Sequence, residues 1–341
     1  MGDAAGVGAE IIVKALAKPE TYEKIIPAVY GDLAPLEDAL RFTHHSDLKI
    51  RVVSSIEEAK GEYGVIDLVD IGLLRKGDWQ YGVNSAVSGN AAYQYVTRAI
   101  ADAMAGKCAG VVTGPISKEA IHMAGHNFSG HTEIFAHETH TRDYSMLLSC
   151  KELKVVHVTT HVSMEQACKM ITKERVLHVI RLAQRGMRLL GYEHPRIAVA
   201  GFNAHCSENG LFGHQEADAI IPAVETARAE GYDVTGPIPP DTVFCKAVAG
   251  MFDIVVAMYH DQGHIPIKLM GFRLDAKTNT FSSMSGINCT IGLPIVRTSV
   301  DHGTAYDRAG KNCANEQSML EAIDAAAVMA KNMKRLKDES V

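Results

Sequence analysis

The amino-acid sequence predicts an α/β protein built from two domains. Short apolar runs alternate with longer segments of helical periodicity along most of the 341 residues. The apolar runs lack the polar alternation of a half-exposed strand, which favours mostly parallel sheets covered by helices on both faces. A chain of this length exceeds one ordinary hydrophobic core, so two α/β/α domains are expected.

Four apolar runs are predicted to be buried strands: residues 110–113, 153–159, 196–200 and 253–258. Four segments have helical spacing: residues 91–105, 173–190, 215–230 and 316–336. Two of these helices are expected to stop at Gly191 and Gly231, because glycine readily takes the left-handed conformation that ends a helix. Near the start of the chain, the glycine-rich turn Gly2 to Glu10 leads into another helix.

Composition excludes several classes of protein. The net charge of −6 argues against a nucleic-acid partner, because binding phosphates requires clustered Lys and Arg. No apolar run approaches the roughly 18 residues of a membrane span, and no secretory leader is recognisable, so we expect no membrane contact and a cytoplasmic location. The seven cysteines are scattered without a CxxC pair, which predicts reduced, mostly buried thiols rather than disulfides or a thiolate zinc site.

Three histidines, His161, His205 and His260, each stand just beyond the carboxyl end of a predicted strand. Ligands bind at that edge of an open α/β sheet, so the three imidazoles are expected to converge. Neutral imidazoles suit a divalent cation such as Zn, Mg, Mn or Co, and three of them leave positions for substrate oxygens. The alternative is that each histidine caps a helix or satisfies a carbonyl. That alternative is the better interpretation of one histidine but not of three equivalent ones.

The segments around these histidines are unusually polar, notably residues 203–210 and 259–264. Asp261, next to His260, is expected to be either a carboxylate that orients the histidine or a further ligand.

A second group of residues suits an anionic substrate: His131, Thr132, Lys268, Asn288 and Arg297. Arg297 ends an apolar run, and its planar guanidinium matches a carboxylate or phosphate. Taken singly, Lys268 or Arg297 is better interpreted as a solvated surface charge. Their position near the predicted metal edge favours substrate contact.

The turn that contains Gly6 and Gly8 would let backbone N–H groups approach an anion at a helix N-terminus. This signal is weak by itself, because the spacing differs from the usual dinucleotide fingerprint. The signal for a binding site becomes more specific when the turn is considered together with the segment Asp301 to Asp307 near the other end of the chain. A strand normally feeds a turn of this kind, and none precedes Gly2, so we expect either that the native start lies upstream or that the chain has been trimmed.

Six segments together resemble the 4-hydroxythreonine-4-phosphate dehydrogenase family of pyridoxal phosphate biosynthesis: Gly2 to Glu10, Thr113 to Lys118, Gly130 to Glu133, Thr159 to His161, Tyr259 to Gly263 and Arg297 to Ala305. They occur in order over essentially the whole chain. The resemblance implies the fold of the isocitrate and isopropylmalate dehydrogenases, with a cleft between two α/β/α domains, here residues 1–127 with 298–341 and residues 128–297. It also implies a homodimer whose sites lie near the subunit interface.

The resemblance assigns roles to the residues above. It implies NAD as cofactor, near Gly6, Gly8, His302, Gly303 and Thr304, and one divalent metal per subunit on the three histidines. It places the substrate on His131, Thr132, Lys268, Asn288 and Arg297.

Several features indicate a paralogous branch that acts on 4-phospho-D-threonate or 4-phospho-D-erythronate. Residues 143–148, 157–162 and 208–213 are more similar to that branch, and Ala4 and Ala9 replace prolines that are usual in the pyridoxal branch. The stretch from 269 to 287 is also longer than expected.

The expected reaction is therefore NAD-dependent oxidation of the C3 hydroxyl, followed by β-decarboxylation to dihydroxyacetone phosphate. Candidates for the proton acceptor are Asp241, Asp261 and Lys118, and the sequence does not rank them. Alternatives are 4-hydroxythreonine-4-phosphate oxidation, a cis-dihydrodiol dehydrogenase, a phosphate acyltransferase and a non-catalytic metabolite-binding protein.

Overall fold

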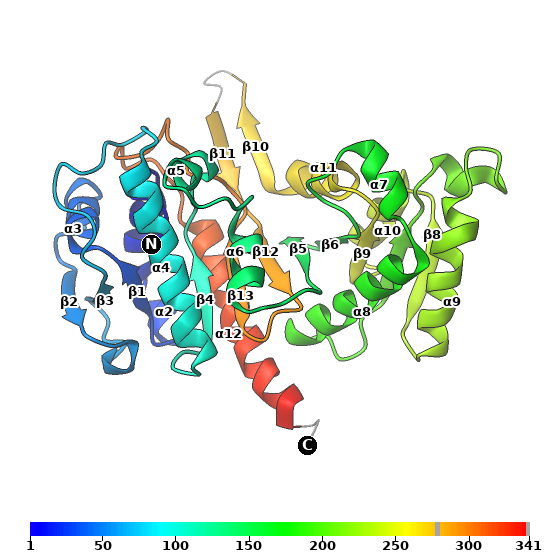
Figure 1. Cartoon of the computed structure of the whole chain (residues 1–341). Coiled ribbons are helices and arrows are strands. Elements are labelled where there is room, and N and C mark those ends of the chain that lie inside the picture. Colours follow the sequence, from blue (N-terminus) through cyan, green and yellow to red (C-terminus); the bar gives the residue numbers. More distant parts are fainter. Residues whose placement is uncertain (277–279, 339–341) are drawn as a thin grey trace. The chain divides into compact units, whose positions relative to one another are not determined.

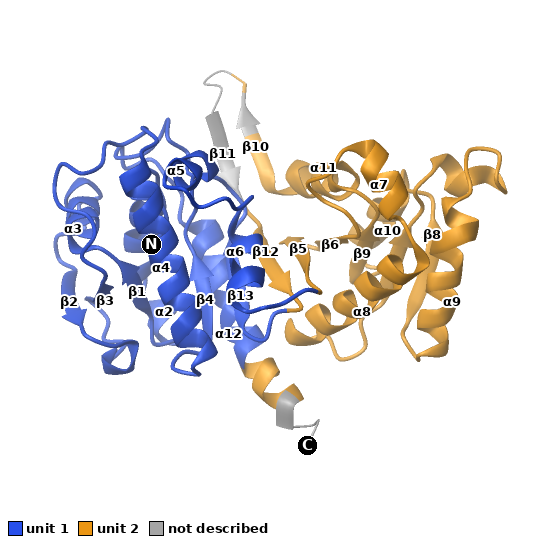
Figure 2. Ribbon diagram, in the orientation of Figure 1, with its two compact units in different colours: residues 1–142, 293–330 blue, residues 143–292, 331–341 orange. Residues whose placement is uncertain are grey.

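The computed structural model describes residues 1–276 and 280–338 and divides into two compact units (Figures 1 and 2). Unit 1 contains residues 1–142 and 293–330, and unit 2 contains residues 143–292 and the chain from 331. Relative to the domain boundaries expected from the sequence, residues 128–142 and 293–297 thus fall in unit 1, and the chain from 331 falls in unit 2. Both units combine strands and helices, which confirms the predicted α/β class.

Unit 1 has two groups of parallel strands. One sheet has the order β1 (Ala28–Gly31), β3 (Val65–Asp70), β2 (Lys49–Val53), and β4 (Gly110–Thr113) pairs with β13 (Val296–Val300). The helices of this unit are α1 (Gly8–Leu16), α2 (Pro19–Tyr22), α3 (Leu33–Phe42), α4 (Ala86–Met104), α5 (Lys118–Met123), α6 (His131–Glu138) and most of α12 (Gln317–Asp338). They pack on the strands around a continuous apolar core in which Leu36 and Leu68 are fully buried.

In unit 2, six strands form a mixed sheet in the order β12 (Ile287–Ile291), β5 (Ser145–Cys150), β6 (Leu153–His157), β9 (Ile254–Ala257), β7 (Ile197–Ala200), β8 (Val234–Ile238). β5 is antiparallel to both of its neighbours, whereas β6, β9, β7 and β8 run parallel. The helices are α7 (Met164–Met170), α8 (Lys173–Leu189), α9 (Ile221–Ala229), α10 (Val243–Val248) and α11 (His260–Gly271). A hairpin of β10 (Phe272–Asp275) and β11 (Thr280–Met284) follows α11.

Local sequence explains where the helices begin and end. The Thr172 side chain accepts a hydrogen bond from the Arg175 N–H at the start of α8, and Ser163 and Gln166 form a capping box on α7. Gly191 and Gly231 have φ of 97° and 88° just past α8 and α9, as predicted from the sequence.

Three sequence predictions need correction. The strand predicted over 153–159 ends at His157, and Arg297, which by itself would be interpreted as a solvated surface charge, is a buried residue inside β13. The cysteines are not mostly buried, since only Cys150 and Cys289 of the seven are. Within the part of the chain that the structure describes, no helix is both long and apolar enough to cross a membrane.

Candidate functional site

Two of the three predicted metal-binding histidines come together in unit 2, beyond the ends of β6 and β9. Thr159 holds the chain after β6 beside the end of β9, because its backbone N–H and its Oγ1 donate to the Met258 carbonyl at 3.2 and 2.9 Å. His260 is the first residue of α11, directly after β9. The ring centroids of His161 and His260 are 5.7 Å apart. The structure therefore places these two imidazoles at one strand edge.

Two histidines that the sequence analysis did not select lie in the same group. His264, one turn further along α11, stacks on His260 with ring centroids 3.6 Å apart, and the buried His157 ring lies 4.7 Å from that of His264. Burial, reinforced by the neighbouring imidazoles, lowers the pKa of His157 to about 3 and that of His264 to about 4. Both rings are therefore neutral at neutral pH. The spacing of four residues between His260 and His264 was the signal that could have found the second one.

Gly263 permits this packing. A Cβ atom on Gly263 would lie 2.3 Å from Nε2 of His157 and 2.6 Å from a methyl carbon of Val155. Only a residue without a side chain lets the start of α11 approach β6 so closely.

The Gln262 side chain links the chain just after β9 to the chain just after β7 through two hydrogen bonds. Its Oε1 accepts from the Met258 N–H at 2.6 Å, and its Nε2 donates to the Gly201 carbonyl at 2.8 Å. The side chain is buried, so these bonds fix the loop after β7 relative to the start of α11.

Asp261 accepts a hydrogen bond from the ring of His260, with Nδ1 and Oδ1 2.7 Å apart. When Nδ1 carries the proton, Nε2 holds the lone pair that a cation or a substrate proton would use.

The third predicted ligand, His205, lies on a short irregular turn, Ala204–Glu208, after β7. The five consecutive residues 205–209 have φ between 45° and 64°. Non-glycine residues seldom occupy this region, and strained backbone of this kind concentrates at functional sites. No ring contact joins His205 to the other histidines among the described residues.

Glu216, which the sequence analysis missed, anchors the start of this turn. Its carboxylate is buried and accepts from the N–H groups of Phe202 and Asn203, both at 2.7 Å, and from Asn203 Nδ2 at 2.8 Å. A buried carboxylate that accepts three hydrogen bonds holds the chain that donates them in one conformation. Glu216 begins a short π-helical turn, Glu216–Ile220, that leads into α9. Sequence alone could not find it, because its partners Phe202 and Asn203 lie 14 and 13 positions earlier in the chain.

Within residues 1–276 and 280–338, no three His, Cys, Asp or Glu side chains lie close enough together to hold a metal ion. The donor chemistry suits a divalent cation in part, since His161 and His260 are adjacent imidazoles, but the third ligand is not beside them.

Of the three candidate proton acceptors, Asp241 and Asp261 lie in unit 2 and Lys118 lies in unit 1. Asp241 is exposed near Cys206, and burial together with the charges of Glu216 and Asp241 raises the pKa of the Cys206 thiol to about 11. Asp241 is thus close to the turn of His205. Lys118, by contrast, is an exposed residue of unit 1 at the start of α5.

Arg297 is buried inside unit 1, 2% exposed, in the middle of parallel strand pairing. Its guanidinium donates to Thr113 Oγ1 at 3.1 Å and lies 5.6 Å from the centre of the Phe135 ring. These contacts hold the planar group in one orientation, as recognition of a carboxylate or phosphate requires.

His131, the first residue of α6, lies near Arg297. Its Nε2 is buried and has no hydrogen-bond partner among the described residues. Burial and the positive charge of Arg297 lower the pKa of His131 well below its usual value. A buried, unsatisfied ring nitrogen beside a cation is suited to a polar ligand. Thr132 follows in the first turn of α6.

The other two predicted substrate residues lie in unit 2. Lys268 is on α11, and its Nζ lies 4.2 Å from the centre of the Phe272 ring. Asn288 is on β12, and its Nδ2 lies 2.8 Å from the sulfur of Met146.

The two predicted cofactor segments meet within unit 1. The Val7 N–H donates to the Thr304 carbonyl at 3.0 Å, and the Tyr306 hydroxyl lies 2.6 Å from Asp3 Oδ2. A Cβ on Gly6 would lie 2.8 Å from the Thr304 carbonyl oxygen. The glycine is therefore required by the contact between the two segments themselves.

Gly8 has a similar structural role, since a Cβ there would lie 2.4 Å from the Met1 carbonyl oxygen. Around Gly303 the space is open, because a Cβ atom added there would meet nothing within 4 Å. The ring of His302 makes a hydrogen bond of 2.9 Å with the Gly303 carbonyl.

Comparison with known proteins identifies the family. Residues 23–326 match the family described as pyridoxal phosphate biosynthetic protein PdxA. The chain belongs to this family. The resemblance found in the sequence is thereby confirmed.

Relatives span nearly the whole chain. A protein of Cupriavidus necator named D-threonate 4-phosphate dehydrogenase is 46% identical over 97% of this chain and 96% of its own length. A 4-hydroxythreonine-4-phosphate dehydrogenase of Trichlorobacter lovleyi is 44% identical with the same coverage. A crystal structure of 4-hydroxythreonine-4-phosphate dehydrogenase from Klebsiella pneumoniae has a TM-score of 0.82, with 43% identity over 97% of this chain and 98% of that one. The protein is therefore an oxidoreductase.

Proposed function

We propose that the protein oxidises the C3 hydroxyl of 4-phospho-D-threonate or 4-phospho-D-erythronate with NAD. The resulting β-keto acid then loses carbon dioxide to give dihydroxyacetone phosphate. The observation that carries this proposal is the 46% identity, over nearly the full chain, to a relative named D-threonate 4-phosphate dehydrogenase. Branch-typical segments in the sequence, such as residues 208–213, favour the same choice.

A divalent cation is proposed to bind to His161, His205 and His260. The adjacency of the first and third rings supports this, as does the hydrogen bond between His260 Nδ1 and Asp261 Oδ1, which leaves the Nε2 lone pair for a cation when Nδ1 carries the proton. When bound, such a cation would lower the pKa of a coordinated hydroxyl and stabilise negative charge on the oxygen of the keto acid. Zn, Mg, Mn and Co all suit imidazole and substrate-oxygen ligands to different degrees.

The cations of the chain are proposed to hold the two anionic ends of the substrate. Arg297, with the neighbouring His131 and Thr132, offers a fixed bidentate donor, whereas Lys268 offers a point charge and Asn288 an amide. A fixed contact to either anionic end limits the orientations of the substrate, and orientation supplies much of the rate in such reactions.

NAD is proposed to bind beside Gly6, Gly8 and the segment His302 to Thr304. The open space at Gly303 supports close approach of a ligand there, although the tight contacts at Gly6 and Gly8 already have a structural cause. The helix α1 begins at Gly8 and adds the partial positive charge of its N-terminus.

Proton transfer needs one base at the hydroxyl and one acid at the enolate carbon. Asp261 is committed to His260 by its hydrogen bond, so we assign it an orienting role and leave Asp241 and Lys118 as the candidates for proton transfer. We also propose that the enzyme is a homodimer with its sites near the subunit interface. Exposed apolar side chains on α7 and α11, among them Met164, Ile265 and Leu269, support such an interface.

The experiment is a comparison of initial rates of NADH formation with three substrates: 4-phospho-D-threonate, 4-phospho-D-erythronate and 4-phosphohydroxy-L-threonine. We expect kcat/KM for one of the first two to exceed that for the third by at least about tenfold, or about 1.4 kcal/mol in transition-state binding. Preference for the third substrate would assign the protein to the pyridoxal branch, and absence of NADH with all three would overturn the proposal.

A further inference from the structure

The proposed reaction needs an acid that gives a proton to the enolate carbon, and the reaction itself limits where this acid can lie. Carbon C2, which loses carbon dioxide, is bonded to C3, whose hydrogen passes to NAD. A proton donor for C2 must therefore be within hydrogen-bond reach of a substrate that is itself in contact with the cofactor. Within the chain, such a group lies where the proposed substrate residues and the proposed cofactor segments meet.

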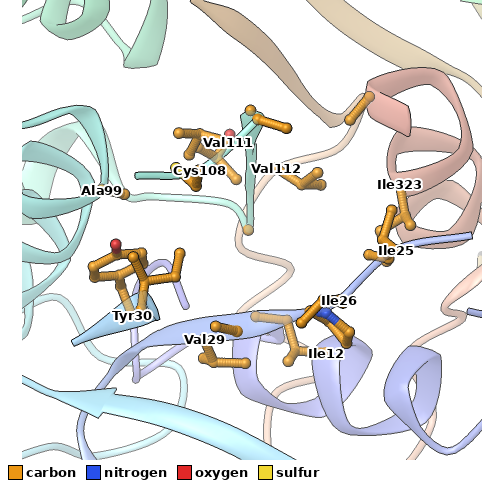
Figure 3. Close-up of a pocket in the computed structure, with 18 of the residues that line it drawn as sticks. Ile12, Ile25, Ile26, Val29, Tyr30, Ala99, Cys108, Val111, Val112 and Ile323 are labelled. Carbon is orange, nitrogen blue, oxygen red and sulfur yellow. The ribbon is translucent and has the colours of Figure 1, made fainter. Parts of the chain in front are cut away.

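The apolar groove of unit 1 is not this place. It has a volume of about 490 Å³ and is lined by side chains such as Val29, Val111 and Ile323 (Figure 3). None of the residues proposed to bind the substrate, the metal or NAD lines it.

The loop between β4 and α5 adjoins the proposed substrate residues at both of its ends. Before the loop, Thr113 at the end of β4 accepts the hydrogen bond from the Arg297 guanidinium at 3.1 Å. After the loop, Lys118 begins α5, and its Cε lies 3.8 Å from the position that a Cβ on Gly130 would take. Gly130 is the residue before α6, which begins with the proposed substrate residue His131.

The same loop also contacts the proposed cofactor segments. The Asp3 N–H, in the glycine-rich turn, donates to the Pro115 carbonyl at 2.9 Å. Ser117 Oγ donates to Asn84 Oδ1 at 2.6 Å, and the Tyr306 hydroxyl lies 2.7 Å from the same oxygen. Tyr306 is two positions after the last residue proposed to contact NAD. The loop that leads to α5 is thus linked to both cofactor segments.

Hydrogen bonds on both sides of Lys118 hold the start of α5 in place. Asn84 Nδ2 donates to Glu119 Oε2 at 2.7 Å. Because a carboxylate only accepts, Nδ2 has to face Glu119, which leaves Oδ1 to face Ser117 and Tyr306. Ser117 is also the residue whose side chain caps α5. The position of Lys118 is therefore set by the chain segments that are proposed to hold the cofactor.

The Lys118 side chain is available to a ligand. It is exposed, and among the described residues its ammonium group has neither a hydrogen bond nor an ion pair. An exposed ammonium group carries a proton at neutral pH, whereas an exposed carboxylate has none to give. Of the two candidates for proton transfer, only Lys118 can thus act as the acid, which leaves Asp241 for the hydroxyl.

We infer that Lys118 is the general acid of the reaction and gives a proton to C2 after carbon dioxide has left. This inference rests on the proposed oxidation of C3. The bond between the carboxylate and C2 breaks, its electron pair forms the double bond between C2 and C3, and the C3 oxygen takes up the negative charge. C2 then takes a proton from the Lys118 ammonium group, the C3 carbonyl forms again, and the Lys118 amine regains a proton from water.

The test follows the configuration of the product made in deuterium oxide. An acid held in the site delivers deuterium to one face of C2, so we expect NMR of the wild-type product to show a single configuration. Lys118→Arg keeps the positive charge but has no proton that it can give up. We expect this variant to lose about 100-fold or more in kcat, with smaller changes in KM, and to give both configurations because water protonates the enolate.

The matched control is Lys49→Arg, the same substitution at an exposed lysine at the amino end of β2. Its kcat and the configuration of its product should equal those of the wild type. Both configurations from wild-type protein, or a single configuration from Lys118→Arg, would overturn the inference, because the proton would then come from water or from another group.

The measurement uses whichever of the three phosphorylated acids gives NADH, so it does not depend on the choice among them. Absence of NADH with all three would overturn the proposed function, and a second measurement then decides the position of Lys118. Acetylation of lysines by acetic anhydride is followed by mass spectrometry with and without NAD. We expect NAD to slow acetylation of Lys118 several-fold and to leave Lys49 unchanged. Equal acetylation of Lys118 in both samples would overturn the inference whatever the substrate.

Discussion

Glu216 offers the sharpest test of how the His205 turn is held. Its carboxylate accepts three hydrogen bonds, two from backbone N–H groups at 2.7 Å and one from Asn203 Nδ2 at 2.8 Å. Glu216→Gln keeps the size of the side chain but removes the negative charge and turns one acceptor into a donor that faces the Asn203 amide.

The expected cost follows from the contacts. Hydrogen bonds to a charged acceptor contribute about 1.5–3 kcal/mol each, roughly twice a neutral bond. Loss of the charge from three such bonds, offset by the lower desolvation cost of a buried amide, gives a net loss of about 1–3 kcal/mol. This corresponds to about 5- to 150-fold faster hydrogen exchange of residues 202–209 if the turn opens locally.

Hydrogen exchange measured by mass spectrometry reads this turn separately from the rest of the chain. The matched control is Glu230→Gln, which breaks an ion pair with Arg181 in which both side chains are substantially exposed and should change stability by less than about 1 kcal/mol. We further expect Glu216→Gln to weaken divalent-metal affinity by about 10- to 100-fold, because groups that orient a ligand typically contribute that much. Exchange of residues 202–209 at the wild-type rate would refute the argument.

Three further predictions concern packing, substrate binding and pH. Gly263→Ala should destabilise the protein by about 1–3 kcal/mol in denaturant titrations, because the added methyl group would lie 2.3 Å from His157 Nε2. Gly303→Ala is the control and should have little effect on stability, because the space around Gly303 is open. Equal stability of the two variants would contradict the packing argument. Arg297→Lys should raise KM for a phosphorylated acid by about tenfold or more in steady-state kinetics, with a smaller change in kcat. The reason is that an ammonium group cannot reproduce the planar donor that Thr113 and Phe135 hold in place. An unchanged KM would show that Arg297 does not bind the substrate. His131 has a pKa well below its usual value of 6.5 in the folded protein, so the unfolded chain binds the proton more readily and stability should fall as the pH drops below about 6.5. His131→Asn should reduce that slope by up to about 1.4 kcal/mol per pH unit in unfolding measurements at pH 7.5 and 5.5, and identical slopes would show that His131 is solvated.

The parts of the fold that local patterns determine could be predicted from the sequence. The strands β4, β7 and β9 are short apolar runs, and the ends of α8 and α9 follow from glycines at positive φ. β5 and β12 were not predicted, because they are antiparallel partners whose pairing is decided by residues far apart in the chain.

The site was predicted in part for the same reason. His161 and His260 follow neighbouring parallel strands, so strand order alone brings them together. His157, Gln262 and Glu216 could not be found in this way, since each acts through a tertiary contact with another element that no sequence spacing records. Arg297 was selected for its charge, but its burial within β13 is a property of the folded sheet.

The most direct test of the account is metal-dependent NADH formation from 4-phospho-D-threonate by protein that has been stripped with a chelator. The account predicts that stripped wild-type protein is inactive and regains activity with a divalent cation. It also predicts that His205→Ala remains inactive at the same cation concentration while unfolding at the wild-type Tm. Activity in the stripped protein, or near-normal turnover by His205→Ala, would contradict the proposed role of the three histidines.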